Sequence, residues 1–263
     1  GTDAEQVAEY LRRHPDFYVS PFLGTYFYRF NVTRPPFDSA AVRQAFCRAT
    51  DRRTITSELL NNGQQPVTSF CPPIKGYSPV EGLSYDPVEA RRLLAAAGYG
   101  PDLEPFPTVE LSYNTSEGHK QIAEAVAGQW KRVLGVSVVT RNSEWKVFLE
   151  DMKKLDYQIC RSSWIGDYMD PSTFFDIFES GSGNNRTGWS SNRYDELLEA
   201  TRSETSEAKR VAKFRAMERI LVETECPILP VYRYVNTGLL SESVRGWYEN
   251  IRNTHPCKYI WLE

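Results

Sequence analysis

The hydrophobic positions in the middle of the chain change period in a regular order. Stretches that alternate or are β-branched predict strands, and stretches with apolar residues three and four apart predict helices. Short loops join the strands to the helices, which favours parallel strands with right-handed crossovers and predicts the core of an α/β lobe. The predicted strands cover residues 108–113, 136–140 and 157–164. The helix between the first two has Ile122, Val126, Trp130 and Val133 along one face and ends at Gly135, and the helix between the last two covers residues 144–155.

Further helices are predicted on both sides of this core. Helical spacing predicts one long helix over residues 39–62, ended by Gly63. In the next helix Asp86 is suited to cap, Pro87 to stand first and Gly98 to end it. Asp170 and Pro171 repeat the cap-then-proline signature and open another helix, and two more are predicted at about 194–202 and 206–225.

Prolines mark two other segments. The stretch from Pro66 to Pro79 contains four prolines and is predicted to be a long surface excursion. The apolar segment 226–236 is predicted to be a strand that prolines interrupt, at an edge or at a crossing between lobes. The fold class predicted from the pattern is therefore α/β.

Composition narrows the classes of function. The 31 Lys and Arg residues and 34 Asp and Glu residues leave a net charge of −3, with no basic stripe for nucleic acid. No apolar run reaches the length of a membrane span. Five cysteines are 24 or more residues apart, which matches no zinc or redox spacing, so we expect buried free thiols and no metal or other cofactor. The first residues are acidic and amphipathic, so any export signal either lies upstream or was never present.

Enzymatic motifs are sparse. No G-x-S-x-G is present, and a serine hydrolase would require His119 to lie beside Ser162 or Ser163, an arrangement that nothing nearby in the sequence orients. The glycines at 181 and 183 follow no strand and lack a P-loop lysine, so they are interpreted as a solvated loop. The sequence therefore favours a binding protein over an enzyme.

One group of residues has the chemistry of a binding site. Trp145, Arg161, Trp164 and Asp167 fall within 23 positions, at the start of a predicted helix and the end of a predicted strand. A carboxylate between tryptophans suits a ligand ammonium, and ligands of open α/β sheets bind beyond the carboxyl ends of the strands. The alternative is purely structural, with the tryptophans in the core, Arg161 paired to a buried acid and Asp167 capping a loop.

Longer motifs in a consistent order resemble a known family. The chain is similar to the C-terminal half of periplasmic oligopeptide-binding proteins, which are solute-binding proteins of ABC transporters. The resemblance rests on FLGTYFYRFN, RPPFDSAAVRQAFCRATDR, YDPVEARRLLAAAGY, NTSEGHKQIAEAVAGQWKRVLGV, the SEW segment, WIGDYMDPSTF and ILPVYRYVN.

The resemblance implies a periplasmic-binding-protein-like lobe with a mixed, mostly parallel sheet flanked by helices. It implies that Asp167 receives the α-ammonium of a peptide, that Trp164 and Trp145 wall side-chain pockets, and that Arg161 and His119 receive the ligand carboxylate. Tyr168 and Asn185 complete the predicted ligand-binding set. The implied partners are an oligopeptide and, in the full-length protein, the permease subunits of an ABC transporter in a periplasmic or extracytoplasmic setting. No nucleic acid and no direct membrane insertion are expected.

The sequence also departs from the family pattern. Met152 stands where the oligopeptide branch has an arginine, and family members are about twice as long. We therefore predict three parts, with residues 1–31 and 236–263 crossing the hinge into a first lobe and residues 32–235 forming the ligand-binding lobe. Such a lobe alone is expected to bind peptides weakly. Dipeptides, nickel complexes or sugars remain alternative ligands, and a sensory or regulatory module remains an alternative class.

Overall fold

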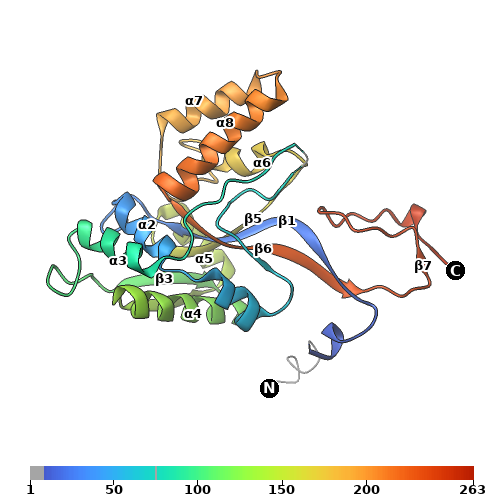
Figure 1. The fold of residues 1–263 in the computed structure, drawn as a ribbon, viewed down its shortest axis with the longest axis horizontal. Coiled ribbons are helices and arrows are strands. Elements are labelled where there is room, and N and C mark those ends of the chain that lie inside the picture. Colours follow the sequence, from blue (N-terminus) through green and yellow to red (C-terminus); the bar gives the residue numbers. More distant parts are fainter. Residues whose placement is uncertain (1–8, 75) are drawn as a thin grey trace.

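The computed structural model describes residues 9–74 and 76–263 and is built on one six-stranded sheet (Figure 1). The strand order is β2-β6-β1-β5-β3-β4, with a separate two-stranded pair β7-β8. Every strand predicted between residues 108 and 164 is present. The strands are β1 (Phe17–Phe30), β2 (Gln65–Pro66), β3 (Val109–Asn114), β4 (Val138–Ser143), β5 (Ile159–Ile165), β6 (Ile228–Leu239), β7 (Val244–Arg245) and β8 (Trp261–Leu262).

The sheet is mixed, as predicted, but its balance of pairings differs from the prediction. β3 pairs in parallel with β4 and with β5, which are the strands that the alternating rhythm indicated. The other three pairings, β1 with β5, β1 with β6 and β2 with β6, are antiparallel. The expectation of a mostly parallel sheet was wrong because the two longest strands come from distant parts of the chain, and local periodicity does not report their direction.

Helices cover both faces of the sheet (Figure 1). On one face α2, α3 and α4 pack against Tyr26, Tyr28 and Phe30 of β1, and on the other α6, α7 and α8 pack against Phe27. Because successive side chains of a strand point to opposite faces, the aromatic strand β1 supplies both cores. The helices are α2 (Ala40–Arg48), α3 (Pro87–Ala96), α4 (Glu117–Leu134), α5 (Trp145–Lys154), α6 (Ser172–Phe175), α7 (Asn192–Arg202) and α8 (Glu207–Arg219).

The predicted cap of α3 is confirmed, whereas the predicted long helix over residues 39–62 is wrong. Asp86 accepts a hydrogen bond from the Glu89 amide, as its position before Pro87 indicates. The long helix ends instead at Arg48, and a π-helical turn, η1 (Thr54–Leu60), follows. The Asp51 carboxylate accepts from the amides of Arg53 and Thr54 near the start of this second segment, so an internal N-cap divides the predicted helix in two.

The proline-rich excursion is held by one buried carboxylate. Glu218 of α8 is fully buried and accepts hydrogen bonds from the amides of Phe70, Cys71 and Val80 and from the Tyr77 hydroxyl. Burial raises the pKa of this carboxyl group, and the four donors oppose that shift. These contacts tie described residues on both sides of position 75 to α8, and Phe70, Cys71 and Tyr77 are buried in the core on that face rather than exposed as a surface excursion would be.

β1 and β6 leave the sheet together and carry the chain toward its two ends (Figure 1). The predicted three-part division puts residues 1–31 outside the lobe, but residues 24–30 pair with β5 at the centre of the sheet. This section of the predicted N-terminal piece is thus a strand of the lobe, while residues 1–8 lie outside the described residues. Four cysteines are buried as free thiols, as predicted, and Cys257 is free and exposed.

Candidate functional site

The candidate site lies where β5 continues beyond its neighbour β3. The pairing of β5 with β3 stops at Cys160, so one edge of β5 is open from Arg161 onward. A cavity of about 200 Å³ occupies this position, between β5 and α5. Its wall is formed by Arg29 of β1, by Trp145, Phe148, Leu149 and Met152 of α5, by Arg161, Ser162, Ser163 and Trp164 of β5, and by Asn184 and Arg186 of the loop before α7.

Trp145 and Trp164, both predicted from the sequence, line this cavity. Glu144 caps α5 by accepting from the amides of Lys146 and Val147, which fixes Trp145 at the first position of the helix. The Trp145 ring stacks on Phe148 at 6.3 Å between centroids and remains 47% exposed. Trp164 is half-buried and donates from its indole Nε1 to the carbonyl of Thr173, 2.6 Å away.

Asp167 follows the end of β5 and presents its carboxylate to solvent. Its position is set by the backbone: the amide of Gly166 donates to the Leu23 carbonyl at 2.8 Å, and the Asp167 amide donates to the Thr173 hydroxyl at 3.0 Å. Among residues 9–74 and 76–263, no hydrogen bond or ion pair engages the Asp167 carboxylate itself. Thr173 therefore orients both Trp164 and Asp167 and leaves the Asp167 carboxylate open.

Arg161 and His119 form the second part of the site, together with tyrosines of the neighbouring strands. The Arg161 guanidinium lies 4.9 Å from the Tyr26 ring centroid, donates to the Tyr234 hydroxyl at 2.9 Å and reaches Asn114 Oδ1 at 3.4 Å. Arg161 is only 8% exposed. His119 Nδ1 lies 3.5 Å from the Tyr26 hydroxyl, so the structure brings these two predicted residues to the same tyrosine.

His119 has the properties of a neutral hydrogen-bonding group. Desolvation by burial, with a smaller effect of the positive Arg161, lowers its pKa to about 4. Its ring is bonded to Tyr26, and the hydroxyl of Ser162 accepts from Arg29 Nε at 3.0 Å. Within the part of the chain that the structure describes, His119 makes no hydrogen bond to a serine, which removes the geometric basis for the serine-hydrolase alternative.

Asp167 and His119 are not part of the cavity wall, and two further predicted residues also lie outside it. Tyr168 is exposed, and its hydroxyl contacts Ser172 at 3.1 Å and Asp176 at 3.3 Å. Asn185 uses its amide to organise its own loop, donating to the carbonyl of Trp189 at 2.8 Å and accepting from the Thr187 hydroxyl at 2.7 Å. The structure therefore gives both residues local contacts outside the cavity wall, and their predicted ligand contacts stay predictions.

The structure adds three residues that the sequence analysis missed. The three line the cavity: Arg29, Asn184 and Arg186. Arg29 lies more than 100 residues before the rest of the wall, whereas Asn184 and Arg186 stand on either side of the predicted Asn185. The one available signal was Arg29 itself, a charged residue within an otherwise aromatic and apolar strand.

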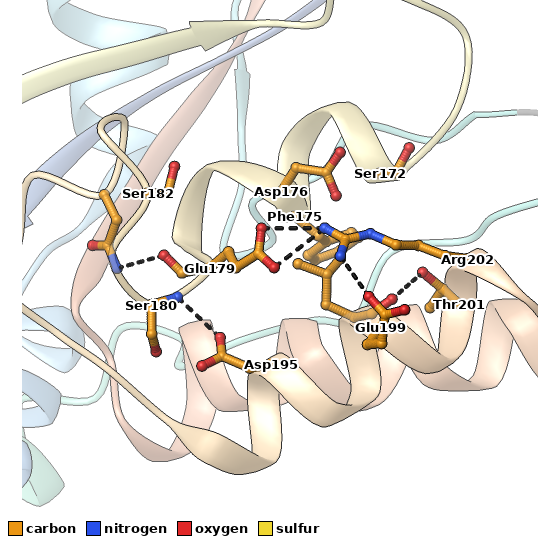
Figure 2. Close-up of polar contacts among 12 residues, drawn as sticks. Ser172, Phe175, Asp176, Glu179, Ser180, Ser182, Asp195, Glu199, Thr201 and Arg202 are labelled. Carbon is orange, nitrogen blue, oxygen red and sulfur yellow. Dashed lines mark hydrogen bonds and ion pairs between the residues drawn. The ribbon is translucent and has the colours of Figure 1, made fainter.

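The loop that carries Asn184 and Arg186 is anchored by a charged cluster at its start (Figure 2). Arg202 of α7 donates to Glu179 at 3.1 Å and to Glu199 at 2.5 Å, and the Ser180 amide donates to the Asp195 carboxylate at 2.9 Å. These charges satisfy one another, which indicates a structural role.

In the described residues, no three His, Cys, Asp or Glu side chains come together as a possible metal site. The same residues contain no helix with the length and apolarity needed to traverse a lipid bilayer.

Comparison with known proteins identifies the family. The family described as bacterial extracellular solute-binding proteins, family 5 (middle region), matches residues 2–186, and the chain belongs to it. Relatives of this chain include proteins named for binding dipeptides and oligopeptides. The resemblance found in the sequence motifs is confirmed.

Individual relatives cover nearly all of this chain. The periplasmic murein peptide-binding protein MppA of Escherichia coli is 38% identical over 237 residues, which cover 88% of this chain and 44% of MppA. The dipeptide-binding protein DppE of Bacillus subtilis is 36% identical over 250 residues, covering 91% and 45%. The unliganded open form of the murein tripeptide-binding protein MppA superimposes with a TM-score of 0.88 at 33% identity, over 98% of this chain and 51% of that one. The chain spans about half the length of the curated relatives that it matches.

Proposed function

We propose that this chain is the ligand-binding half of the substrate-binding component of an ABC peptide importer. The observation that carries the proposal is the Asp167 carboxylate, which is open to solvent while Thr173 fixes the backbone beside it. A carboxylate in this setting suits the α-ammonium of a peptide, bound by a charge-assisted hydrogen bond. Trp145 and Trp164 supply aromatic surface for the apolar parts of the ligand.

Arg161 and His119 are proposed to receive the carboxylate at the other end of a short peptide. Arg161 is buried, and its hydrogen-bond partners are a hydroxyl group and a side-chain amide. Neither partner neutralises its positive charge, so the charge is available to an anion. His119 is neutral and contributes a hydrogen bond rather than a charge. Recognition of the two termini leaves side chains free to vary, which suits a receptor for many peptides.

The remaining parts of the proposal concern the whole protein. We infer an extracytoplasmic location, permease subunits as partners, a binding role without catalysis, and a first lobe that completes the clamp through residues outside this lobe. Support comes from the family, which is described as extracellular, and from relatives that carry "periplasmic" in their names. A single lobe shields only one side of a ligand, so tight binding is expected of the full-length protein and weak binding of this chain alone.

The experiment is calorimetric titration of the full-length protein containing this chain with trialanine and with N-acetyl-trialanine. Acetylation removes the ammonium, and Asp167→Asn removes its charge partner. Each change is expected to weaken binding by about 2–5 kcal/mol, and the two losses should not add because they remove the same contact. Asp102→Asn, an exposed acid in another loop, is the matched control and should bind as wild type does.

An unchanged affinity of Asp167→Asn would move the ammonium site elsewhere and overturn this assignment. Dipeptides are the second candidate ligand, because one close relative is named as a dipeptide-binding protein. Titration with dialanine under the same conditions separates the two, since a site built for dipeptides should bind dialanine more tightly than trialanine.

A further inference from the structure

The side chains that line the cavity between α5 and β5 carry an unusual excess of positive charge. Three of the residues that line it, Arg29, Arg161 and Arg186, are arginines, and no acidic residue is among the others. In the described part of the chain, none of these three guanidinium groups lies in an ion pair with a carboxylate. The proposed function uses only Arg161, so the charges of Arg29 and Arg186 call for a separate explanation.

Arg29 is buried yet has only neutral partners. It is 4% exposed, donates from Nε to the Ser162 hydroxyl and from Nη1 to the Asn184 carbonyl, both at 3.0 Å, and lies 5.2 Å from the Phe27 ring centroid. Burial lowers its pKa, and the nearby positive charge of Arg186 acts in the same direction. Buried charges in proteins are normally paired, because removing an ion from water costs several kcal/mol. The second terminal nitrogen, Nη2, has no hydrogen bond recorded within the described residues.

The other two arginines are also short of partners. The buried Nε of Arg161 has no hydrogen-bond partner among the described residues. Arg186 is half-buried, and its side chain reaches only the Gly183 carbonyl, at 3.4 Å, while the Tyr157 hydroxyl holds its backbone. Arg29 and Arg186 thus bring two positive charges to one small space whose lining holds no acid, while the Arg161 guanidinium lies against Tyr26 on the opposite face of the sheet. An anion from outside the chain would relieve the mutual repulsion of Arg29 and Arg186.

We propose that this cavity receives an acidic side chain of the bound peptide, so that the protein selects ligands containing aspartate or glutamate. Arg29 and Arg186 supply the guanidinium donors, which suit the two oxygens of a carboxylate, and Trp145 and Trp164 enclose the methylene groups. The inference rests on the proposed function, since it assigns a side-chain preference to the same peptide. The volume of about 200 Å³ suits one side chain rather than a second ligand.

The first test varies the ligand and leaves the protein intact. The full-length protein is titrated calorimetrically with tetra-alanine and with the eight peptides that carry one glutamate or one glutamine at each of the four positions. We expect one position at which glutamate binds at least tenfold more tightly than glutamine, and the difference should shrink as salt concentration rises. Glutamate and glutamine peptides that bind equally at all four positions would overturn the inference, while binding of tetra-alanine would still uphold the proposed function. Failure of every peptide to bind would overturn both.

The second test varies the protein. Arg186→Gln is expected to reduce at least fivefold the ratio of the affinity for the glutamate peptide to the affinity for the glutamine peptide. Arg29→Gln should act in the same direction, and Arg186→Gln carries the test if the buried Arg29 is needed for folding. Arg193→Gln removes the same charge from an exposed position on α7 and is the matched control. A preference that survives Arg186→Gln, or that Arg193→Gln removes equally, would contradict the assignment.

Discussion

The Arg161 guanidinium donates a 2.9 Å hydrogen bond to the hydroxyl of Tyr234, which joins β5 to β6 across the intervening strand β1. Between the two lies Tyr26 of β1, whose ring is 4.9 Å from the guanidinium and stacks on Tyr232 at 4.7 Å. This contact couples the proposed carboxylate site to the strand that leads out of the lobe. The Tyr234 hydroxyl is therefore expected to serve both stability and ligand binding.

Tyr234→Phe removes the hydroxyl and leaves the ring in place. Arg161 then loses the shorter of its two side-chain hydrogen bonds, and we expect the free energy of unfolding to fall by about 1–2 kcal/mol, measured by urea denaturation. Tyr248→Phe, in a side chain that is 60% exposed, is the control and should stay within about 0.5 kcal/mol of wild type. Equal stability of the Tyr234 variant and wild type would show that this hydrogen bond makes no net contribution to the free energy of unfolding.

His119 predicts a dependence of stability on pH. Its pKa is about 4 in the folded chain and near 6.5 when unfolded, so the unfolded state takes up the proton first as the pH falls. The stabilising contribution is complete above about pH 6.5 and is lost as the pH falls toward 4. Because the ring is only partly buried, solvent screening limits the loss to about 1–2 kcal/mol. His119→Gln should remove this slope from a series of urea denaturations between pH 7 and pH 4.

The same pKa can be measured directly by NMR titration of the His119 ring. Arg161→Gln removes the neighbouring positive charge and should raise the measured pKa, although burial keeps it below the ordinary value. A wild-type pKa near 6.5 would contradict the prediction. A pKa that does not respond to Arg161→Gln would assign the whole shift to burial.

Local signals in the sequence were sufficient for most helices and for the parallel strands. Asp86 before Pro87 predicted the start of α3, and the alternating rhythm predicted β3, β4 and β5. The interruption at Asp51 was missed because an apolar stripe continues across it, and only contact with Gln129 of α4 shows why the chain turns there. The antiparallel pairing of β1 with β6 joins segments some 200 residues apart, which no local period reports.

The same distinction applies to the candidate site: local sequence signals predicted some of its residues, and only the fold brings the others together. Trp145 and Trp164 stand at ends of elements that the sequence predicts, Arg161 lies within the same predicted strand as Trp164, and the structure brings the three to one cavity. Arg29 and Arg186 were missed because their convergence depends on the β1–β5 register and on a loop anchored by Arg202. Burial and pairing are properties of the folded chain, so the unpaired charge of the cavity becomes visible only in the structure.

Glu218 offers a strong test of how the proline-rich excursion is held. Glu218→Gln replaces one carboxylate oxygen with an amide NH₂, which cannot accept the hydrogen bonds that the surrounding donors supply. The variant therefore loses part of the four-donor contact in a fully buried position. We expect the free energy of unfolding to fall by about 2–4 kcal/mol in urea denaturation. Glu199→Gln, which removes only an exposed ion pair on α7, is the control and should change stability by less than about 1 kcal/mol. Similar effects of the two substitutions would deny Glu218 its organising role.

Gly166 tests whether the position of Asp167 depends on a close approach of β5 to β1. A Cβ at Gly166 would lie 2.8 Å from Leu23 Cδ2 and 3.0 Å from Phe174 Cε2, both on buried side chains. Gly166→Ala is therefore expected to destabilise the chain by about 1–3 kcal/mol and, by displacing the Asp167 loop, to weaken peptide binding by the full-length protein. Gly128→Ala is the matched control: on the exposed side of α4, with no atom within 4 Å of the added Cβ, it should stabilise the chain by about 0.5–1 kcal/mol and leave binding unchanged. Thermal unfolding and calorimetric titration with trialanine measure both effects, and a Gly166→Ala protein that binds as wild type does would show that the loop adjusts without moving the carboxylate.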